Sequence, residues 1–204
     1  MNKYLIIAAQ VVSIIFTPWY LPLLGFVLLL MFSYLNVLPW ELKLMMIGMV
    51  YLFTVLLPYW SVYIYRRVNG WTRHEMSQKE RRIVPYVLSI MCYAALLYLM
   101  QTFHMPSFTM AVIAGALAVQ IACAIVNLWI KVSTHAAAIG GILGCLMAFS
   151  LVFAFDPTRW LCLTILVAGV VCTSRMILRQ HTLAELGLGL LIGILCGWGA
   201  VGFI

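Results

Sequence analysis

Three polar residues stand in a fixed order near the C-terminal end of an apolar chain: Arg175, His181 and Glu185. Ionisable side chains are costly in lipid, so a cluster of them beside apolar segments indicates a functional site. His181 and Glu185 are four residues apart and share one face of a helix. The carboxylate can bond one imidazole nitrogen and leave the other free to attack. The guanidinium of Arg175 matches phosphate oxygens, so the cluster predicts phosphoryl chemistry.

A second polar cluster, at residues 131–135, supplies another histidine. His135 is placed to protonate a leaving alkoxide as a general acid. Ser133 and Thr134 can donate to phosphate oxygens, and Lys131 adds positive charge. The segment that follows is rich in alanine and glycine, which lets helices approach closely. Ser133 or Thr134 would equally serve as an ordinary helix N-cap, and that alternative stays open.

A third, basic cluster precedes Pro85 and contains Lys79, Arg81 and Arg82. Lys79 and Arg82 share a face if this segment is helical. Phosphoryl transfer depends on stabilising charge on the phosphoryl oxygens, which basic side chains can do. The five acidic residues include no pair spaced as a magnesium site, so we expect neither a metal nor another cofactor. The alternative for this cluster is a basic patch that contacts lipid headgroups.

The elements that must position these residues are membrane helices. The 204-residue chain is 66% hydrophobic and 8% charged, with a mean hydropathy of +1.10. These values predict one multi-span membrane domain over residues 1–204, without a soluble appendage. The net charge of +7 lies in short loops, so we expect membrane lipids and not nucleic acid as partners. The six cysteines form no C-x-x-C pair, and no zinc site or disulfide framework is expected.

The apolar pattern predicts an all-α integral membrane bundle of six to seven transmembrane helices. The six clear spans are expected near 42–65, 84–102, 107–130, 136–155, 159–174 and 182–204. Residues 1–40 form an apolar segment that Pro18 and Pro22 interrupt, and we read its signal-like start as retained. Either one bent helix spans the membrane there, or a broken helix dips in beside a protein-lined cavity.

Counting crossings brings the three polar clusters to one membrane face. The opposite face is marked by polar and aromatic residues typical of a headgroup belt, namely Trp40, Glu41, Lys43, Asp156, Arg159 and Trp160. The predicted bundle therefore carries its active-site motifs together at one face.

The C-terminal cluster follows a regular spacing: Ser174-Arg175, five residues, His181, three residues, Glu185. This pattern resembles the third motif of the type 2 phosphatidic acid phosphatase superfamily, which shares its site with vanadium-dependent haloperoxidases. That family has Asp at the last position. Residues 132–135 resemble its Pro-Ser-Gly-His motif, with Val132 and Thr134 replacing Pro and Gly. The first motif of that family is Lys, six residues, Arg-Pro, and this chain does not keep it. Lys79, Arg82 and Pro85 are the residues that would take the places of its Lys, Arg and Pro. The resemblance covers residues 79–185.

The resemblance implies a metal-independent hydrolase of lipid phosphates that forms a phosphohistidine on His181. It gives Arg175 the role of binding phosphate, His135 that of general acid and Glu185 that of orienting His181. Candidate substrates are phospholipid, polyprenyl phosphate or diphosphate, and lipid A-type phosphates. A lipid phosphotransferase and a non-catalytic protein that binds or translocates a lipid phosphate are the alternatives.

The expected location is a bacterial-type inner membrane, crossed several times. The excess of Arg and Lys on the motif side predicts a cytoplasmic site by the positive-inside rule, whereas the resemblance implies a site on the outer, periplasmic face. No pattern in the sequence fixes the oligomeric state.

Overall fold

The computed structural model describes residues 3–32, 38–70 and 83–202, and these residues form helices and their connections. The predicted all-α membrane class is confirmed. Within the described residues, six helices are long and apolar enough to cross a membrane: Trp40–Val68, Val84–Thr102, Ser107–Val126, Thr134–Val152, Thr158–Ile177 and Leu183–Gly202. They agree with the six predicted spans, with ends that differ by a few residues.

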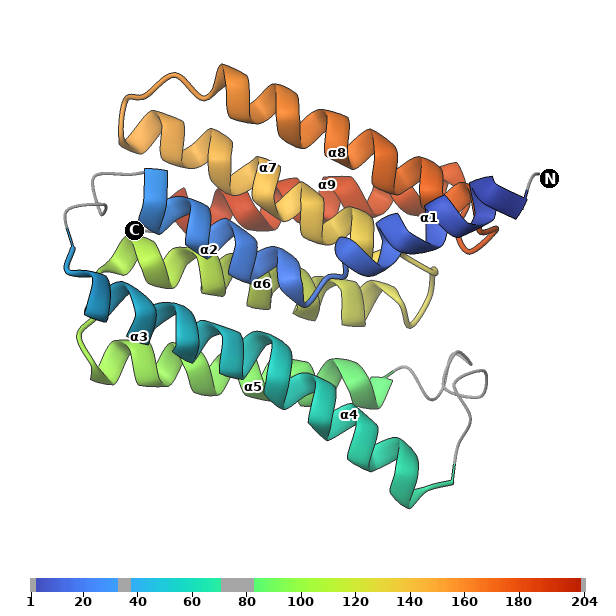
Figure 1. Ribbon diagram of the computed structural model, residues 1–204, viewed down its shortest axis with the longest axis horizontal. Helices are drawn as coiled ribbons and strands as arrows, with labels where there is room; N and C mark the ends of the chain where they lie inside the picture. Colours follow the sequence, from blue (N-terminus) through green and yellow to red (C-terminus); the bar gives the residue numbers. More distant parts are fainter. Residues whose placement is uncertain (1–2, 33–37, 71–82, 203–204) are drawn as a thin grey trace.

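The spans lie side by side along the long axis of the molecule (Figure 1). The first consists of α3 (Trp40–Tyr51), the π-helical turn η2 (Leu52–Leu56) and α4 (Leu57–Val68). The others are α5 (Ile83–Thr102), α6 (Ser107–Val126), α7 (Thr134–Val152), α8 (Thr158–Ile177) and α9 (Leu183–Gly202). Pro58 explains the π-helical turn, because it cannot donate the backbone hydrogen bond of a regular helix.

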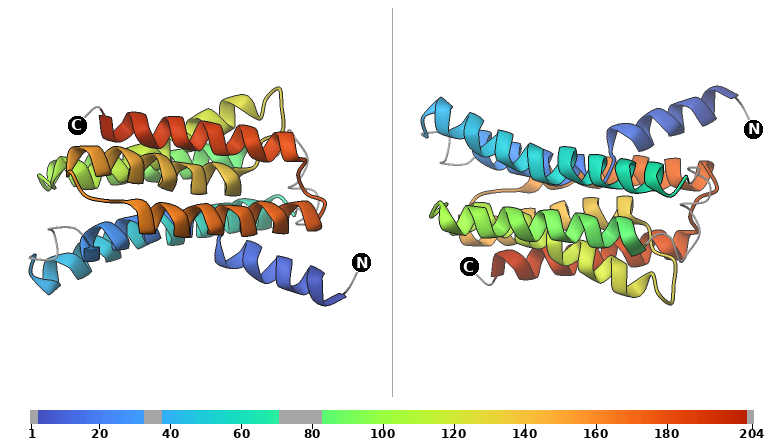
Figure 2. Two further views of the ribbon diagram at one scale, coloured as in Figure 1. Left: turned by 90° about the horizontal axis from the view of Figure 1, so that it is seen from above. Right: turned by 90° about the horizontal axis from the view of Figure 1, so that it is seen from below.

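The N-terminal apolar segment is broken. Helix α1 (Lys3–Ile15) and helix α2 (Tyr20–Phe32) have 13 residues each and meet at an angle of 61°. Neither piece has the roughly 20 residues needed to span a bilayer. Helix α2 packs inside the bundle against α6, α7 and α3, whereas α1 contacts α8. Figure 2 shows α1 leaving the line of the bundle in both views.

Helices α7 and α9 are in backbone contact because glycines face each other along their crossing. A Cβ atom on Gly140 or Gly144 would collide with backbone atoms of α9. A Cβ on Gly193 or Gly197 would collide with backbone atoms of α7. Glycine is required here because only a residue without a side chain permits this approach.

This contact places the N-terminal ends of α7 and α9 next to each other. The backbone N–H of Ser133 donates to the carbonyl of Glu185 at 3.4 Å. The first and second polar clusters of the sequence are therefore joined through the backbone as well as through packing. The largest buried apolar cluster lies elsewhere, between α2, α3, α5 and α6, around Phe26, Val50, Tyr93 and Leu96.

Candidate active site

The polar clusters at residues 131–135 and 174–185 meet at one end of the bundle. The α6–α7 and α8–α9 connections lie at the same end as the end of α4 and the start of α5 (Figure 1). Lys79, Arg81 and Arg82 of the third cluster lie outside the described residues. Their proposed part in the site stays a prediction.

His181 and Glu185 are hydrogen-bonded as predicted, but only Glu185 lies on a helix, because α9 begins at Leu183 and His181 precedes it. Nδ1 of His181 donates to Oε2 of Glu185 at 2.7 Å, and the two side chains are 8% and 19% exposed. This bond assigns the proton to Nδ1 and leaves a lone pair on Nε2. Among the described residues, Nε2 has no hydrogen-bond partner and is available to a ligand.

Thr182 and Glu185 form a capping box at the start of α9. Thr182 Oγ1 accepts from the backbone N–H of Glu185 at 3.3 Å, and Oε2 of Glu185 accepts from the N–H of Thr182 at 3.4 Å. The carboxylate that orients His181 is therefore held by the helix terminus. We did not predict this role of Thr182, although T-x-x-E before an apolar run is its sequence signature.

The environment of His181 favours the neutral imidazole. Partial burial lowers the pKa of His181 below its usual value of 6.5, and the positive charges of Arg175 and Lys131 lower it further. The hydrogen bond to Glu185 opposes this effect, but the net direction is downward. A neutral ring with a free lone pair is the form that can act as a nucleophile.

Arg175 lies on the last turn of α8, because that helix continues to Ile177. The prediction that this span ends at residue 174 was three residues too short. Nη1 of Arg175 donates to the hydroxyl of Ser13 at 2.7 Å. Its Nε–H is buried without a hydrogen-bond partner in the described structure.

His135 lies in the first turn of α7 and also contacts Ser13. Its Nε2 donates to the carbonyl oxygen of Ser13 at 3.2 Å. Its Nδ1 is buried and has no partner among the described residues. Ser13 on α1 thus bridges His135 and Arg175. Sequence reasoning missed Ser13, because nothing local relates it to residues 122 and 162 positions away.

The other residues of the second cluster have structural contacts. Ser133 is fully buried and caps α7, its Oγ accepting from the N–H of Ala136 at 3.4 Å. This is the alternative role considered for it, and its contact with phosphate stays a prediction. Lys131 Nζ donates to the carbonyl of Gln180 at 2.5 Å and ties the α6–α7 connection to the α8–α9 connection.

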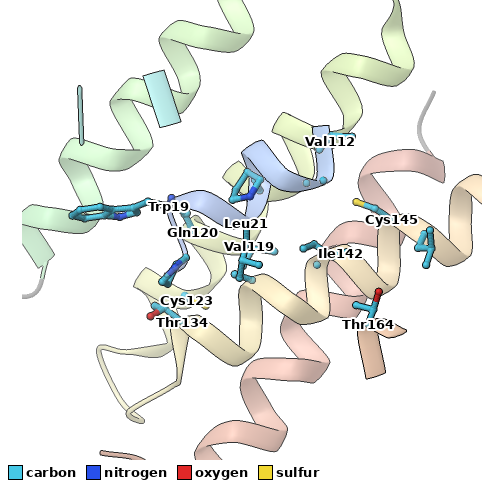
Figure 3. Close-up of a pocket in the computed structure, with 18 of the residues that line it drawn as sticks. Trp19, Leu21, Val112, Val119, Gln120, Cys123, Thr134, Ile142, Cys145 and Thr164 are labelled. Atoms are coloured by element: carbon cyan, nitrogen blue, oxygen red, sulfur yellow. The ribbon is translucent and has the colours of Figure 1, made fainter. Parts of the chain in front are cut away.

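Arg175, His181 and Thr134 line one end of a cavity of about 700 Å³. Its remaining walls come mainly from apolar side chains of α2, α6 and α7, several of which are labelled in Figure 3. A polar end joined to an apolar cavity suits a ligand with an ionic headgroup and a hydrocarbon body.

Comparisons of the chain with protein-family models, with curated proteins and with solved structures found no match.

Proposed function

We propose that the protein is an integral-membrane phosphatase of lipid phosphates that acts through a phosphohistidine on His181. The observation that carries the proposal is the arrangement of His181. Glu185 orients its ring, Arg175 lies beside it, and all of this stands at the polar end of an apolar membrane cavity. The motif resemblance of residues 174–185 supports the same chemistry.

In the first step, Nε2 of His181 attacks phosphorus and forms a P–N bond. The bond between phosphorus and the lipid oxygen breaks. His135, which enters this step as the imidazolium with a proton on both nitrogens, gives its Nε2 proton to the leaving alkoxide and becomes neutral. Glu185 stabilises the cationic ring on His181 through the Nδ1 bond. Arg175 neutralises charge on the phosphoryl oxygens.

In the second step, water attacks the phosphohistidine. His135, now neutral at Nε2, accepts a proton from that water, the P–N bond breaks and inorganic phosphate leaves. His181 regains its lone pair, so both histidines return to their starting states.

The contacts of Ser13 support this assignment of roles. Nε2–H of His135 and Nη1–H of Arg175 already point at two oxygen atoms of one residue. Those oxygens stand where the ester oxygen and a phosphoryl oxygen of a substrate would stand. The buried Nε–H of Arg175, which has no partner in the described structure, would gain one from a bound phosphate.

The test is phosphate release by protein purified in detergent, without added metal and with a chelator present. The substrates are phosphatidic acid, phosphatidylglycerol phosphate, polyprenyl phosphate and diphosphate, and phosphorylated lipid A. Wild type releases phosphate and His181→Ala does not. Equal rates for both on every lipid refute the phosphatase. Transfer to an added alcohol in place of water supports the phosphotransferase, and lipid binding without turnover supports the non-catalytic alternative.

We propose a cytoplasmic site in a bacterial-type inner membrane, because the described basic residues gather at the site end. Arg66 and Arg67 lie in the last turn of α4, Lys131 lies in the α6–α7 connection, and Arg175 and Arg179 lie at and just after the end of α8. Lys43 and Arg159 lie in the first turns of α3 and α8, at the other end. Labelling of Val68→Cys and Asp156→Cys by a membrane-impermeant maleimide in intact cells tests this. Labelling of Asp156→Cys alone supports the cytoplasmic site, and labelling of Val68→Cys alone puts the site outside.

A further inference from the structure

The cavity that begins at His181 continues along the whole length of α7. Its lining includes one stripe of that helix, at positions Thr134, Ala138, Gly141, Ile142, Cys145, Leu146, Phe149 and Phe153. A stripe of α6 runs antiparallel to it, from Cys123 through Val119 to Val112. In Figure 3, Thr134 and Cys123 lie at one end of the view, and Cys145 and Val112 lie toward the other. The site and the far end of the bundle thus share one cavity.

The length of this cavity follows from helix geometry. Thr134 begins α7 and Phe153 is its C-cap, 19 residues later, which at 1.5 Å per residue is about 28 Å. The hydrocarbon core of a bilayer is roughly 30 Å thick, so a lipid tail of one leaflet reaches about half of it. The cavity is therefore close to twice as long as the tail of an ordinary phospholipid.

The walls between the two ends suit hydrocarbon. The hydroxyls of Ser89 and Thr164 donate to carbonyls of their own helices, at 2.9 Å and 2.7 Å, and are not offered to a ligand. The Tyr86 hydroxyl accepts from Asn127 at 2.8 Å. Among the lining residues, the basic side chains Arg175 and His181 both lie at the site end. A ligand thus meets charge at one end only.

We propose that the cavity holds one hydrocarbon chain longer than a leaflet tail, as in a polyisoprenoid phosphate, with the phosphate at His181. This inference rests on the proposed function for the position of the phosphate. It narrows the substrate class from lipid phosphates in general to those with a single long chain. Diacyl phospholipid phosphates fill only the half of the cavity next to the site.

Gly25 on α2 offers a way to shorten the cavity. It lines the cavity, and the nearest neighbour of a Cβ added there would be Cγ1 of Val112, at 4.0 Å. Gly25→Ala and Gly25→Leu therefore fill part of the cavity with a side chain, and the added Cβ does not collide with backbone. Gly169 on α8 is exposed and a Cβ there meets nothing within 4 Å, so Gly169→Leu is the matched control.

The experiment measures kcat/KM for prenyl monophosphates of increasing chain length and for dipalmitoyl phosphatidic acid. We expect kcat/KM to rise with chain length in wild type and in Gly169→Leu. Gly25→Leu should lower it roughly tenfold for the longest chain, since several methylene groups lose their burial, and leave the shortest unchanged. For the longest chain, kcat/KM of Gly25→Ala should lie between those of wild type and Gly25→Leu. Rates independent of chain length, equal losses for short and long chains, or a faster reaction with phosphatidic acid overturn the inference.

A binding experiment separates this inference from the phosphatase. A long polyprenol with a terminal photoreactive diazirine carries no phosphate, and its crosslinking needs no turnover. We expect its label on the far half of α7, near Phe149 and Phe153, with less label in Gly25→Leu than in Gly169→Leu. Crosslinking in the cavity without phosphate release would support the binding site for the hydrocarbon chain and refute the phosphatase. Phosphate release with label confined to lipid-facing residues would support the phosphatase and refute the binding site for the chain.

Discussion

Nδ1 of His181 donates to Oε2 of Glu185 at 2.7 Å, and the same oxygen accepts the backbone N–H of Thr182. The bond fixes the imidazole tautomer that leaves Nε2 free. Because the carboxylate is also a helix cap, its position is set by the fold as well as by the histidine.

Replacing Glu185 by Gln should lower kcat by about 100-fold or more, because the amide no longer stabilises the cationic ring and can present its NH₂ group to Nδ1. Glu41→Gln, at the other end of the bundle, is the matched control and should leave kcat unchanged. Steady-state kinetics on the preferred lipid phosphate decide the matter. A Glu185→Gln enzyme within twofold of wild type would exclude an orienting role for this carboxylate.

The pH dependence follows from the lowered pKa of His181. The ring must be neutral to attack, so kcat should fall as pH drops through a pKa below 6.5. Lys131→Met removes a charge that lowers this pKa and should move the acid limb to higher pH. Glu185→Gln removes the bond that raises it and should move the limb to lower pH.

The same shift affects stability. The unfolded chain binds a proton on this histidine at higher pH than the folded protein does, so acidification favours unfolding. The stabilising contribution is present above the unfolded pKa and is lost as pH falls through the folded one.

The kinetic prediction is checked by pH profiles of kcat for wild type, Lys131→Met and Glu185→Gln on one substrate. Because the substrate is the same, its own ionisation affects all three profiles equally. Limbs that coincide in all three would contradict the assignment to His181.

The glycine contact between α7 and α9 should be intolerant of a single methyl group. Gly193→Ala places a Cβ against backbone atoms of Ala137 and Gly141 and should cost about 1–3 kcal/mol of stability. Activity should fall with it, because the same contact aligns His135 with Glu185. Gly199→Ala, whose Cβ meets nothing within 4 Å, should be neutral or slightly stabilising. Thermal unfolding in detergent compares them, and equal midpoints would argue against the contact.

Ser13→Ala should strengthen inhibition by inorganic phosphate. The hydroxyl accepts a hydrogen bond from Arg175 that phosphate must replace, and bonds to charged groups of this kind correspond to roughly a tenfold change in affinity. Ser150→Ala, whose hydroxyl bonds its own helix, is the control. A weaker inhibition in Ser13→Ala would mean that Ser13 holds Arg175 in place for phosphate instead of competing with it.

The membrane bundle could be predicted from the sequence because apolar length and proline position act locally. The pairing of His181 with Glu185 was predicted from their spacing. The predicted shared helix was wrong for His181, because α9 begins two residues later, at Leu183. The capping box of Thr182 could have been predicted too, from its spacing to Glu185.

Other parts of the site required three-dimensional packing. No local pattern brings Ser13 to His135 and Arg175, because the three residues are far apart in sequence and meet only where α1 packs against α8. The length of the cavity likewise depends on how α2, α6 and α7 meet. The extra turn that carries Arg175 on α8 was missed, because its polar side chain was read as the end of the span.

The most direct measurement is to trap the phosphoenzyme. Protein incubated with a lipid phosphate labelled with ³²P at the phosphate, quenched and digested should carry label that is stable to alkali and released by acid, on the peptide that contains His181. His181→Asn should carry none. His135→Asn should gain label more slowly than wild type, because His135 protonates the leaving alkoxide, and should lose it more slowly, because His135 also activates the water. An unlabelled enzyme that turns over the substrate, or equal label in wild type and His181→Asn, would contradict the account.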